Sequence, residues 1–504
     1  MRFRFFNARP IILILISLVV GILLTNYFYT SKITFLVILL VFVALTIFYT
    51  IYCKQMSICL VMFITALIGS ISLQVFVINF QKTDTIIVGD EVECVVVNKY
   101  KKYKNKFFVK DIKINGVKQK FNAFVSCNVN DDLWFDEGNT IKFTITKIYE
   151  YDLIKEGADI VSSDCLGDKT KYQFSTDNID LISNKSTIRH SIKLKIKSLL
   201  LKGLNNENTE LMYSALFGDK TELNSNLYSR YQISGVAHIL AVSGLHVGLI
   251  VLILKKILQV LKVNKYAVLS IILAVLIGYS CLCNWSYSVI RASIMAVVVI
   301  LAPLFFREYD FLSAIGFAGV LILMVSPYAL FDISFVLSFM SVLGICLIFP
   351  MIRKLLRKHK MCNWFTESLG ISIATNLAIL VPSVYYFNSF NPISIFSNIV
   401  VLPLFSIVFT FVFVLSIISI VLPFISILFC LVNPLINALN LITTIISSYG
   451  FSLVANKIKF LSIISYTVVL FFISKFNIKK GMTKAVSILV VLSIFALQLG
   501  IGLV

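Results

Sequence analysis

The chain has 504 residues, of which 58% are hydrophobic and only 14% are charged, and its formal net charge is +20. A water-soluble domain needs roughly a quarter of its residues charged, so this composition excludes a globular protein without a membrane. Pro and Gly are scarce, which favours long helices over barrel strands for the apolar stretches. The positive charge alone does not indicate nucleic acid, because cytoplasmic loops of membrane proteins are rich in Lys and Arg.

The first 80 residues are predicted to form membrane-spanning helices. Three arginines precede the first apolar run, which resembles a signal sequence but has no clear cleavage site, so we expect a retained anchor. Each run is long enough to cross roughly 30 Å of hydrocarbon, and three crossings from a cytoplasmic start place the next segment outside. The runs cover residues 11–29, 33–52 and 58–80.

Residues 81–186 are predicted to form an extracytoplasmic all-β domain. Apolar and polar residues alternate in stretches such as "KFFVKDIKI" and "TIKFTITKI", and turn signals such as Asn115-Gly116 separate them. Five or so strands in roughly a hundred residues suit an OB-like barrel. Cys94, Cys127 and Cys165 lie in this segment, where an oxidising exterior would permit one disulfide between a pair that the sequence does not identify.

The stretch from residue 99 to residue 120 is strongly basic and contains interleaved aromatic residues. Asp111 is its only acidic residue. Cations that follow a phosphate backbone, beside aromatic rings on which bases stack, are what sequence-independent binding of a single strand requires. An ordinary solvated hairpin is the alternative. The residues expected to bind DNA are Lys99, Lys101, Lys102, Lys104, Lys106, Lys110, Tyr100 and Tyr103.

Residues 187–235 form the next segment, which begins with a basic amphipathic pattern. Ile188, Ile192 and Ile196 recur at helical spacing, and basic residues occupy most other positions. Such a helix is expected to lie on the membrane surface.

Residues 236–504 are predicted to form the main transmembrane domain. The positive-inside rule supports its orientation, because an outside start makes the three basic loops at 255–265, 353–360 and 475–484 cytoplasmic. The same count leaves Val504 on the outer side. The expected spans lie near 236–261, 267–283, 286–305, 311–324, 330–352, 366–386, 393–420, 422–446, 461–473 and 485–504.

Polar and ionisable side chains inside hydrocarbon are costly, roughly 2.5 to 3.5 kcal/mol for a charged one on insertion scales, so those that persist mark pathways, pairs or sites. The first group lies in "HILAVSGLHVGLI", where His238 and His246 are two turns apart and would share a face of one helix. Ser243 precedes His246 by three residues, and Gly244 and Gly248 allow close approach of another backbone or a break in the helix. A tight helix crossing with satisfied polar groups is the alternative.

Three more groups follow along the chain. Arg291 lies beside Ser286 and Ser288 and needs an anionic partner, a water-filled cavity or a phosphate. Asp332, which precedes Ser334 and Phe335, is its candidate partner, and a structural ion pair is the alternative for both. Asn391-Pro392 and Asn398 with Pro403 are expected to break helical regularity at membrane depth, with a kinked helix as the alternative.

These groups, after an outer OB-like insert, resemble the ComEC family of bacterial competence proteins, which form the channel for transforming DNA. The resemblance covers residues 11–504, and its specific stretch is "SALFGDKTELNSNLYSRYQISGVAHILAVSGLHVGLI", followed by "SVIRA", "FDISFVLSF" and "NIVVLPL". Val336 stands where the family often has Gln. The positions that the resemblance makes motif residues are Gly218, Asp219, Ser243, Gly244, His246, Gly248, Arg291, Asp332, Ser334, Phe335, Asn398 and Pro403.

The resemblance implies a channel in the bacterial cytoplasmic membrane that transports a single DNA strand, without catalytic residues or cofactors. Many members carry a C-terminal metallo-β-lactamase-like domain, which is expected to be absent here because the chain's four histidines are scattered. A separate nuclease and an outer DNA receptor protein are then expected. The chain shows no phosphate-binding G-x-x-x-x-G-K-[ST] loop, so an ATP-driven, helicase-like partner inside is implied. A homo-oligomer is among the open alternatives.

Two other functions fit parts of the pattern. An intramembrane serine protease could use Ser243 and His246, although both residues lie three apart on one helix, where attack geometry is poor. A secondary transporter for small anions could use Arg291 as its substrate anchor, although no clear inverted repeat is visible.

Overall fold

The computed structural model describes residues 9–27, 56–81, 86–100, 106–119, 121–127, 135, 137–150, 170–184, 186–357, 362–450, 453–454 and 461–473. They fall into two compact units. The first unit comprises Met1–Ile192 and Ser313–Asp332, and the second comprises Lys193–Leu312 and Ile333–Val504. The expected spans at 33–52 and 485–504, Cys165 and Val504 lie outside the described residues.

Two apolar helices of the first unit, α2 (Pro10–Tyr27) and α4 (Met56–Gln81), pack closely against each other. A Cβ atom at Gly21 would lie 2.1 Å from the carbonyl oxygen of Ala66, so only glycine permits this approach. The hydroxyl groups of Ser17 and Thr65 are 2.6 Å apart across the same contact. Small and hydroxylated residues at such an interface are typical of helices that associate in lipid.

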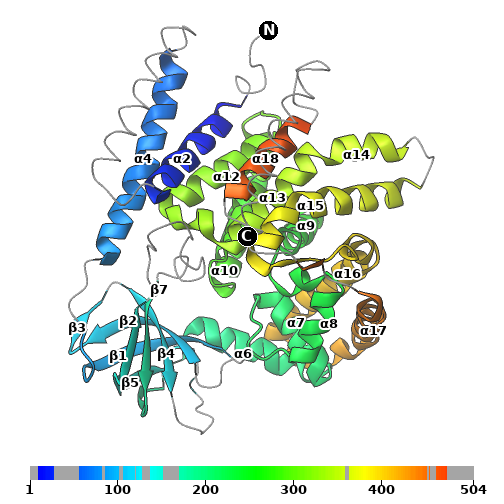
Figure 1. Cartoon of the computed structure of the whole chain (residues 1–504). Helices are drawn as coiled ribbons and strands as arrows, with labels where there is room; N and C mark the ends of the chain where they lie inside the picture. Colours follow the sequence, from blue (N-terminus) through cyan, green and yellow to red (C-terminus); the bar gives the residue numbers. More distant parts are fainter. Residues whose placement is uncertain are drawn as a thin grey trace. The chain divides into compact units, whose positions relative to one another are not determined.

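The first unit also contains the predicted β domain (Figure 1). Its sheet runs in the order β6-β7-β4-β2-β1-β5-β8, with β3 paired to β2. All neighbours are antiparallel except β4 and β7, which are parallel. The strands are β1 (Glu91–Tyr100), β2 (Lys106–Ile114), β3 (Val117–Lys118), β4 (Asn122–Cys127), β5 (Thr140–Thr144), β6 (Lys147–Glu150), β7 (Thr170–Thr176) and β8 (Asp180–Ser183).

Alternation along the strands separates the core of this domain from its outer face. Phe107 is fully buried among the core residues, whereas its neighbour Phe108 joins Val97 and Phe124 in a small separate cluster. Successive side chains of a strand point to opposite faces, which explains why adjacent phenylalanines belong to different clusters.

The second unit is helical, and α6 (Ile188–Leu200) leads into it from the first. Two short strands, β9 (Ser389–Phe390) and β10 (Leu453–Val454), pair within it. Its other helices are α7 (Asn206–Phe217), α8 (Ser225–Ile233), η1 (Ala237–Leu240), α9 (Gly244–Val260), α10 (Lys265–Leu282), α11 (Tyr287–Leu304), α13 (Ile333–Leu347), α14 (Phe349–Leu356), α15 (Asn363–Phe387), α16 (Ser394–Val421), η4 (Pro423–Leu431), α17 (Asn433–Tyr449) and α18 (Leu461–Ile473). Two elements, α12 (Phe311–Val325) and η2 (Pro327–Phe331), lie mainly in the first unit.

Four described helices, α10, α11, α15 and α16, are long and apolar enough to cross a membrane. Two bent pairs, α13 with α14 and η4 with α17, raise this number to as many as six. Polytopic membrane insertion, predicted from hydropathy, agrees with this architecture.

Two local predictions were wrong. The apolar run 236–261 is not one helix, because residues 241–243 lie between η1 and α9 in non-helical conformation. His238 and His246 therefore do not share a helix face. The second error concerns α16, which continues through Asn398 and Pro403. The irregularity occurs before Ser394, around Pro392, and the proline inside the helix does not end it.

Candidate functional site

The N-terminus of α9 is built by Ser243 and His246. Ser243 is the N-cap residue in extended conformation, and His246 occupies the third helical position. The backbone N–H of Ser243 donates to Nδ1 of His246 at 2.9 Å, and the Ser243 hydroxyl lies 3.0 Å from the same nitrogen. The imidazole thus acts as the glutamate or glutamine of a capping box would.

This contact assigns the histidine a structural task. An Nδ1 that accepts a backbone N–H carries no proton, so the neutral ring holds its proton on Nε2. The ring is fully buried and lies edge-on to Phe405 and Phe409, with centroids 5.3 and 4.5 Å away. Nε2 has no hydrogen-bond partner among the described residues. A helix cap accounts for the proximity of Ser243 and His246 without acyl chemistry.

Arg291 of α11 reaches this helix end although only 4% of its surface is exposed. Its Nη1 donates to the carbonyl oxygen of Ser338 at 2.7 Å, and the guanidinium lies 5.8 Å from the ring centre of Phe339. A Cβ atom at Gly244 would lie 2.8 Å from Nη2 of Arg291. Glycine at the first position of α9 therefore makes room for the guanidinium.

Hydroxyl groups tie the surrounding backbone together. Ser288 donates its hydroxyl to the carbonyl oxygen of Val242 at 2.7 Å, which fixes the segment that leads into α9. Its backbone N–H donates to the hydroxyl of Ser334 at 3.3 Å, and the hydroxyls of Ser286 and Ser334 are 3.2 Å apart. These contacts join the beginnings of α11 and α13 beside Arg291.

The electrostatics of this helix end favour an anion. The first N–H groups of a helix lack intrahelical acceptors and carry a partial positive charge. The guanidinium of Arg291 adds a full positive charge at the same place, and its Nε has no hydrogen-bond partner within the described chain. No carboxylate in the described part of the second unit forms an ion pair with Arg291. Its expected partner Asp332 belongs to the first unit, so that pairing stays a prediction.

The remaining motif residues lie in other elements of the second unit. Gly218 ends α7 with a φ of 73°, and a Cβ there would contact Val242 at 3.4 Å. Asp219 accepts from the N–H and hydroxyl of Thr221 and lies 3.6 Å from Nζ of the buried Lys193 on α6. This pairing was not predicted, because the basic residues of this helix were expected to lie on the polar face of a helix on the membrane surface.

Two other predicted residues, Asn398 and Gly248, have no side-chain hydrogen bond to the N-terminus of α9 in the described part of the chain. Asn398 lies 3.5 Å from the Ser372 hydroxyl, and its Oδ1 has no partner among the residues described. Gly248 has open space where a Cβ would point. The structure brings together Ser243, Gly244, His246, Arg291 and Ser334, and His238 lies near enough to interact electrostatically with His246. Within the described ranges no hydrogen bond connects Asp219, Asn398 or Pro403 with that end. Phe335 stacks on Phe339 at 4.1 Å and so belongs to its surroundings.

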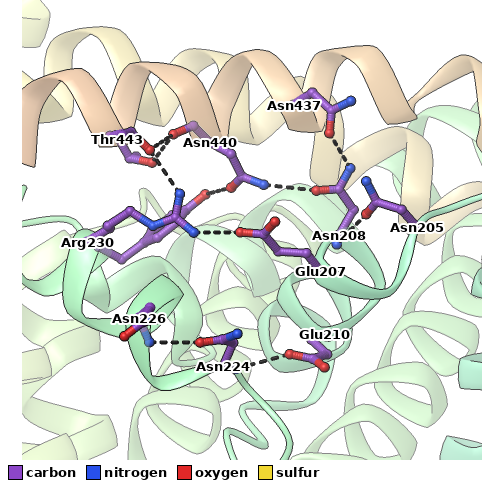
Figure 2. A network of polar contacts seen from close by, with 12 residues as sticks. Asn205, Glu207, Asn208, Glu210, Asn224, Asn226, Arg230, Asn437, Asn440 and Thr443 are labelled. Carbon is purple, nitrogen blue, oxygen red and sulfur yellow. Dashed lines mark hydrogen bonds and ion pairs between the residues drawn. The ribbon is translucent and has the colours of Figure 1, made fainter.

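A network of amide side chains joins α7, α8 and α17 (Figure 2). Asn208 of α7 donates to Asn433 and Asn437 of α17, both at 2.7 Å, and accepts from Asn440 at 2.9 Å. The Tyr231 hydroxyl donates to Asn440 at 2.7 Å, which extends the network to α8. Hydropathy gave no sign of this network, although the asparagines of α17 recur at helical spacing.

The β domain presents part of the predicted basic surface. Lys106 donates to Gln173 at 2.9 Å and lies 4.6 Å from the ring centre of Phe124. Lys110 lies 5.5 Å from the ring centre of Phe108. Lys101, Lys102, Tyr103 and Lys104 lie outside the described residues, as do the side chains of Lys99 and Tyr100.

Cys94 and Cys127 are both free and buried, so they do not form a disulfide with each other, and the third cysteine of the segment, Cys165, lies outside the described residues. In the described ranges no group of three or more His, Cys, Asp or Glu side chains is placed to hold a metal ion.

The fold and the helix-end site define a polytopic helical membrane protein that carries a separate β domain. A profile of the family described as Competence protein matches residues 215–479, more than half of the chain. The chain belongs to this family, the ComEC family of competence proteins.

Two curated relatives are partial matches. The ComE operon protein 3 of Bacillus subtilis (strain 168) is 25% identical over 243 residues, which are 47% of this chain and 30% of that protein. An uncharacterized protein of Aquifex aeolicus (strain VF5) is 37% identical over 134 residues, which are 26% of this chain and 32% of that protein. The match therefore spans about a third of each relative. No solved structure matches the chain.

Proposed function

We propose that this protein conducts a single DNA strand across the bacterial cytoplasmic membrane during DNA uptake. The observation that carries the proposal is Arg291, a buried cation at the positive end of α9 without a carboxylate partner in the described second unit. Burial of a charge without a counter-charge is costly, and within the described second unit Arg291 meets only the Ser338 carbonyl and the Phe339 ring, so an anion would stabilise it there. A phosphodiester passing the helix end would supply that anion, and the helix N-terminus would add its own attraction.

The proposed path is lined near Ser243, His246, Arg291 and Asn398. Ser243 and His246 act on it through the helix cap, which orients the free N–H groups of α9. Arg291 contributes the charge and Gly244 the room for it. In this proposal none of these residues is catalytic.

An OB-like barrel for the β domain is part of the proposal, and the strand pairing supports it. β5 and β6 are separated only by residues 145–146. β5 pairs with β1 and β6 pairs with β7, so these two strands together close the path β1-β2-β4-β7 into a ring. If β5 and β6 are counted as one strand, the ring has five strands, of which only β4 and β7 are parallel neighbours. This order fits a Greek-key barrel, a fold whose loops and second and third strands bind oligonucleotides in other proteins.

The basic surface of this domain is proposed to hold incoming DNA on the outer side of the membrane. Lys106 stands over the ring of Phe124 on the neighbouring strand β4, and Lys110 stands over the ring of Phe108 on its own strand, so the cations that would contact phosphates lie beside aromatic residues. The domain boundaries at residues 80, 186 and 235, the orientation of the spans, and the helicase-like, receptor and nuclease partners remain proposals.

The test is DNA uptake in a naturally transformable strain whose own family member has been deleted. The strain is complemented with the wild-type chain, with Arg291→Gln or with Arg230→Gln, a cation of α8 that contacts Thr444 and Glu207 away from the α9 end. Labelled duplex DNA is added, and nuclease-protected single strands inside the cells are measured at equal membrane levels of each protein. We expect uptake with the wild type and Arg230→Gln and at least about a tenfold loss with Arg291→Gln.

Equal uptake with Arg291→Gln would contradict the proposed path. If small inorganic anions stabilised the wild-type protein against unfolding but not the Arg291→Gln variant, while DNA uptake stayed intact, transport of small anions would replace the proposal.

A further inference from the structure

The α14 segment combines charge and exposed apolar surface on one short helix. It follows α13 after a bend of 46°, with Pro350 in its first turn. Ile352 is buried, whereas Leu355 is 54% exposed and Met351 is 36% exposed. Lys354 and Arg357 are exposed beside them. The helix therefore has an outer face that is both cationic and apolar, which no other described element covers.

The neighbouring end of α15 continues this surface. Phe349 packs against Gly370, where a Cβ would lie 3.0 Å from its ring, so α14 rests on the first turns of α15. Trp364 in the first turn of α15 is 57% exposed. Exposed tryptophan next to lysine and arginine is typical of the level at which a helix leaves the hydrocarbon.

One carboxylate only partly neutralises the cations. Glu367 accepts from Nη2 of Arg353 at 2.5 Å and from Nη2 of Arg357 at 3.3 Å, both on its Oε1. Two arginines share this single acid, and Lys354 has no recorded ion pair in the described chain. The surface thus keeps a net positive charge that a row of phosphates could match.

We propose that the α14 surface, formed by Met351, Lys354, Leu355, Arg357 and Trp364, binds the headgroups of anionic phospholipids. The chain enters α14 from an apolar helix and leaves it through α15, which is long enough to span a bilayer, so α14 lies at headgroup depth. Its apolar side chains enter the acyl boundary and its cations meet lipid phosphates, as in other interfacial helices. A lipid fits this surface better than an acidic protein segment, because a bilayer offers phosphates to the cations and acyl chains to the apolar side chains at once. The inference does not depend on DNA as the transported substrate.

The test is thermal unfolding of the purified full chain in detergent micelles titrated with phosphatidylglycerol or phosphatidylcholine. The variant is Lys354→Gln with Arg357→Gln. Its matched control is Lys255→Gln with Lys256→Gln, which removes the same charge from exposed positions of α9. We expect phosphatidylglycerol, but not phosphatidylcholine, to raise the unfolding temperature of the wild type and the control. The α14 variant is expected to need about thirtyfold more phosphatidylglycerol for the same rise, since each of the two cations near an anionic surface contributes about 1 kcal/mol.

Equal responses of the two double variants would overturn the proposal, since they would show a general charge effect. Equal responses of the wild type to both lipids would overturn it as well. If the double variant does not fold in phosphatidylcholine, the single exposed change Lys354→Gln replaces it, with Lys255→Gln as its control. A smaller shift, about fivefold toward higher phosphatidylglycerol, is then expected for the loss of one cation, and an unchanged titration would refute the α14 site.

Discussion

Arg291 lies so close to Gly244 that a methyl group on the glycine would stand 2.8 Å from its Nη2. The contact joins a buried cation on α11 to the first residue of α9, where the helix exposes its free N–H groups. Both elements attract an anion to the same point, so the proposed path depends on this spacing.

Replacing Gly244 with alanine is therefore expected to move the guanidinium and reduce DNA uptake at least about tenfold, because misplacement of a site by about 1 Å can cost 10²-fold. Gly248→Ala is the matched control on the same helix, since a Cβ there meets no atom within 4 Å. Uptake of labelled DNA by complemented deletion cells measures the effect. Equal uptake by the two variants would refute a role for the Gly244 contact.

Because His246 caps α9, we expect substitutions at this position to lower the stability of the protein by different amounts. His246→Leu fills the site but leaves the Ser243 N–H without an acceptor, which should lower the free energy of unfolding by about 1–3 kcal/mol. His246→Gln keeps an acceptor at the third helical position and should lose less. Denaturant unfolding in detergent compares the two variants. A protease that needs the imidazole as a base would instead lose all activity in both.

The amide network predicts a large stability effect at Asn208. Asn208→Leu removes a buried amide that bonds to Asn433, Asn437 and the buried Asn440, so the free energy of unfolding should fall by about 2–4 kcal/mol. Glu207→Gln is the control, because it breaks a partly exposed pair with Arg230 that should contribute less than about 1 kcal/mol. Similar losses in both variants would contradict a cooperative network.

Burial raises the pKa of the Cys94 thiol well above its usual range. A raised pKa lowers the fraction of reactive thiolate at pH 8, so native Cys94 should resist iodoacetamide and react once the chain is unfolded. Cys362, which is exposed, serves as the reactive control. Peptide mass spectrometry measures the labelling. Native labelling of Cys94 as fast as that of Cys362 would show that the β-domain core is open.

Hydropathy predicted the long helices because each leaves an apolar run of spanning length in the sequence. The predicted spans at 267–283, 286–305 and 366–386 correspond to α10, α11 and α15. Alternation likewise predicted the strands around Phe107, and the place of Phe108 in a second, smaller buried cluster follows from the same period.

The site could be predicted only in part. Ser243, Gly244, His246 and Arg291 were found because polar residues stand out in an apolar run, but the break before α9 leaves no trace in hydropathy. The sequence signal for this break is a serine that precedes a histidine by three residues. The histidine takes the place of the acid or amide that a capping box usually has. The carbonyl of Ser338, which accepts from Arg291, has no sequence signal, since every residue carries one.

The measurement that tests the central claim most directly is cross-linking of the incoming strand to the first turn of α9. A photoreactive residue replaces Leu245, which is 40% exposed beside Gly244, or Ile277 of α10, which is 52% exposed and serves as the control. Competent cells receive labelled DNA, are illuminated during uptake, and the purified protein is examined for attached strand. The proposal predicts attachment at position 245 and not at 277, and its loss in the Arg291→Gln background. Strand entry without any attachment at position 245 would contradict a path past this helix end.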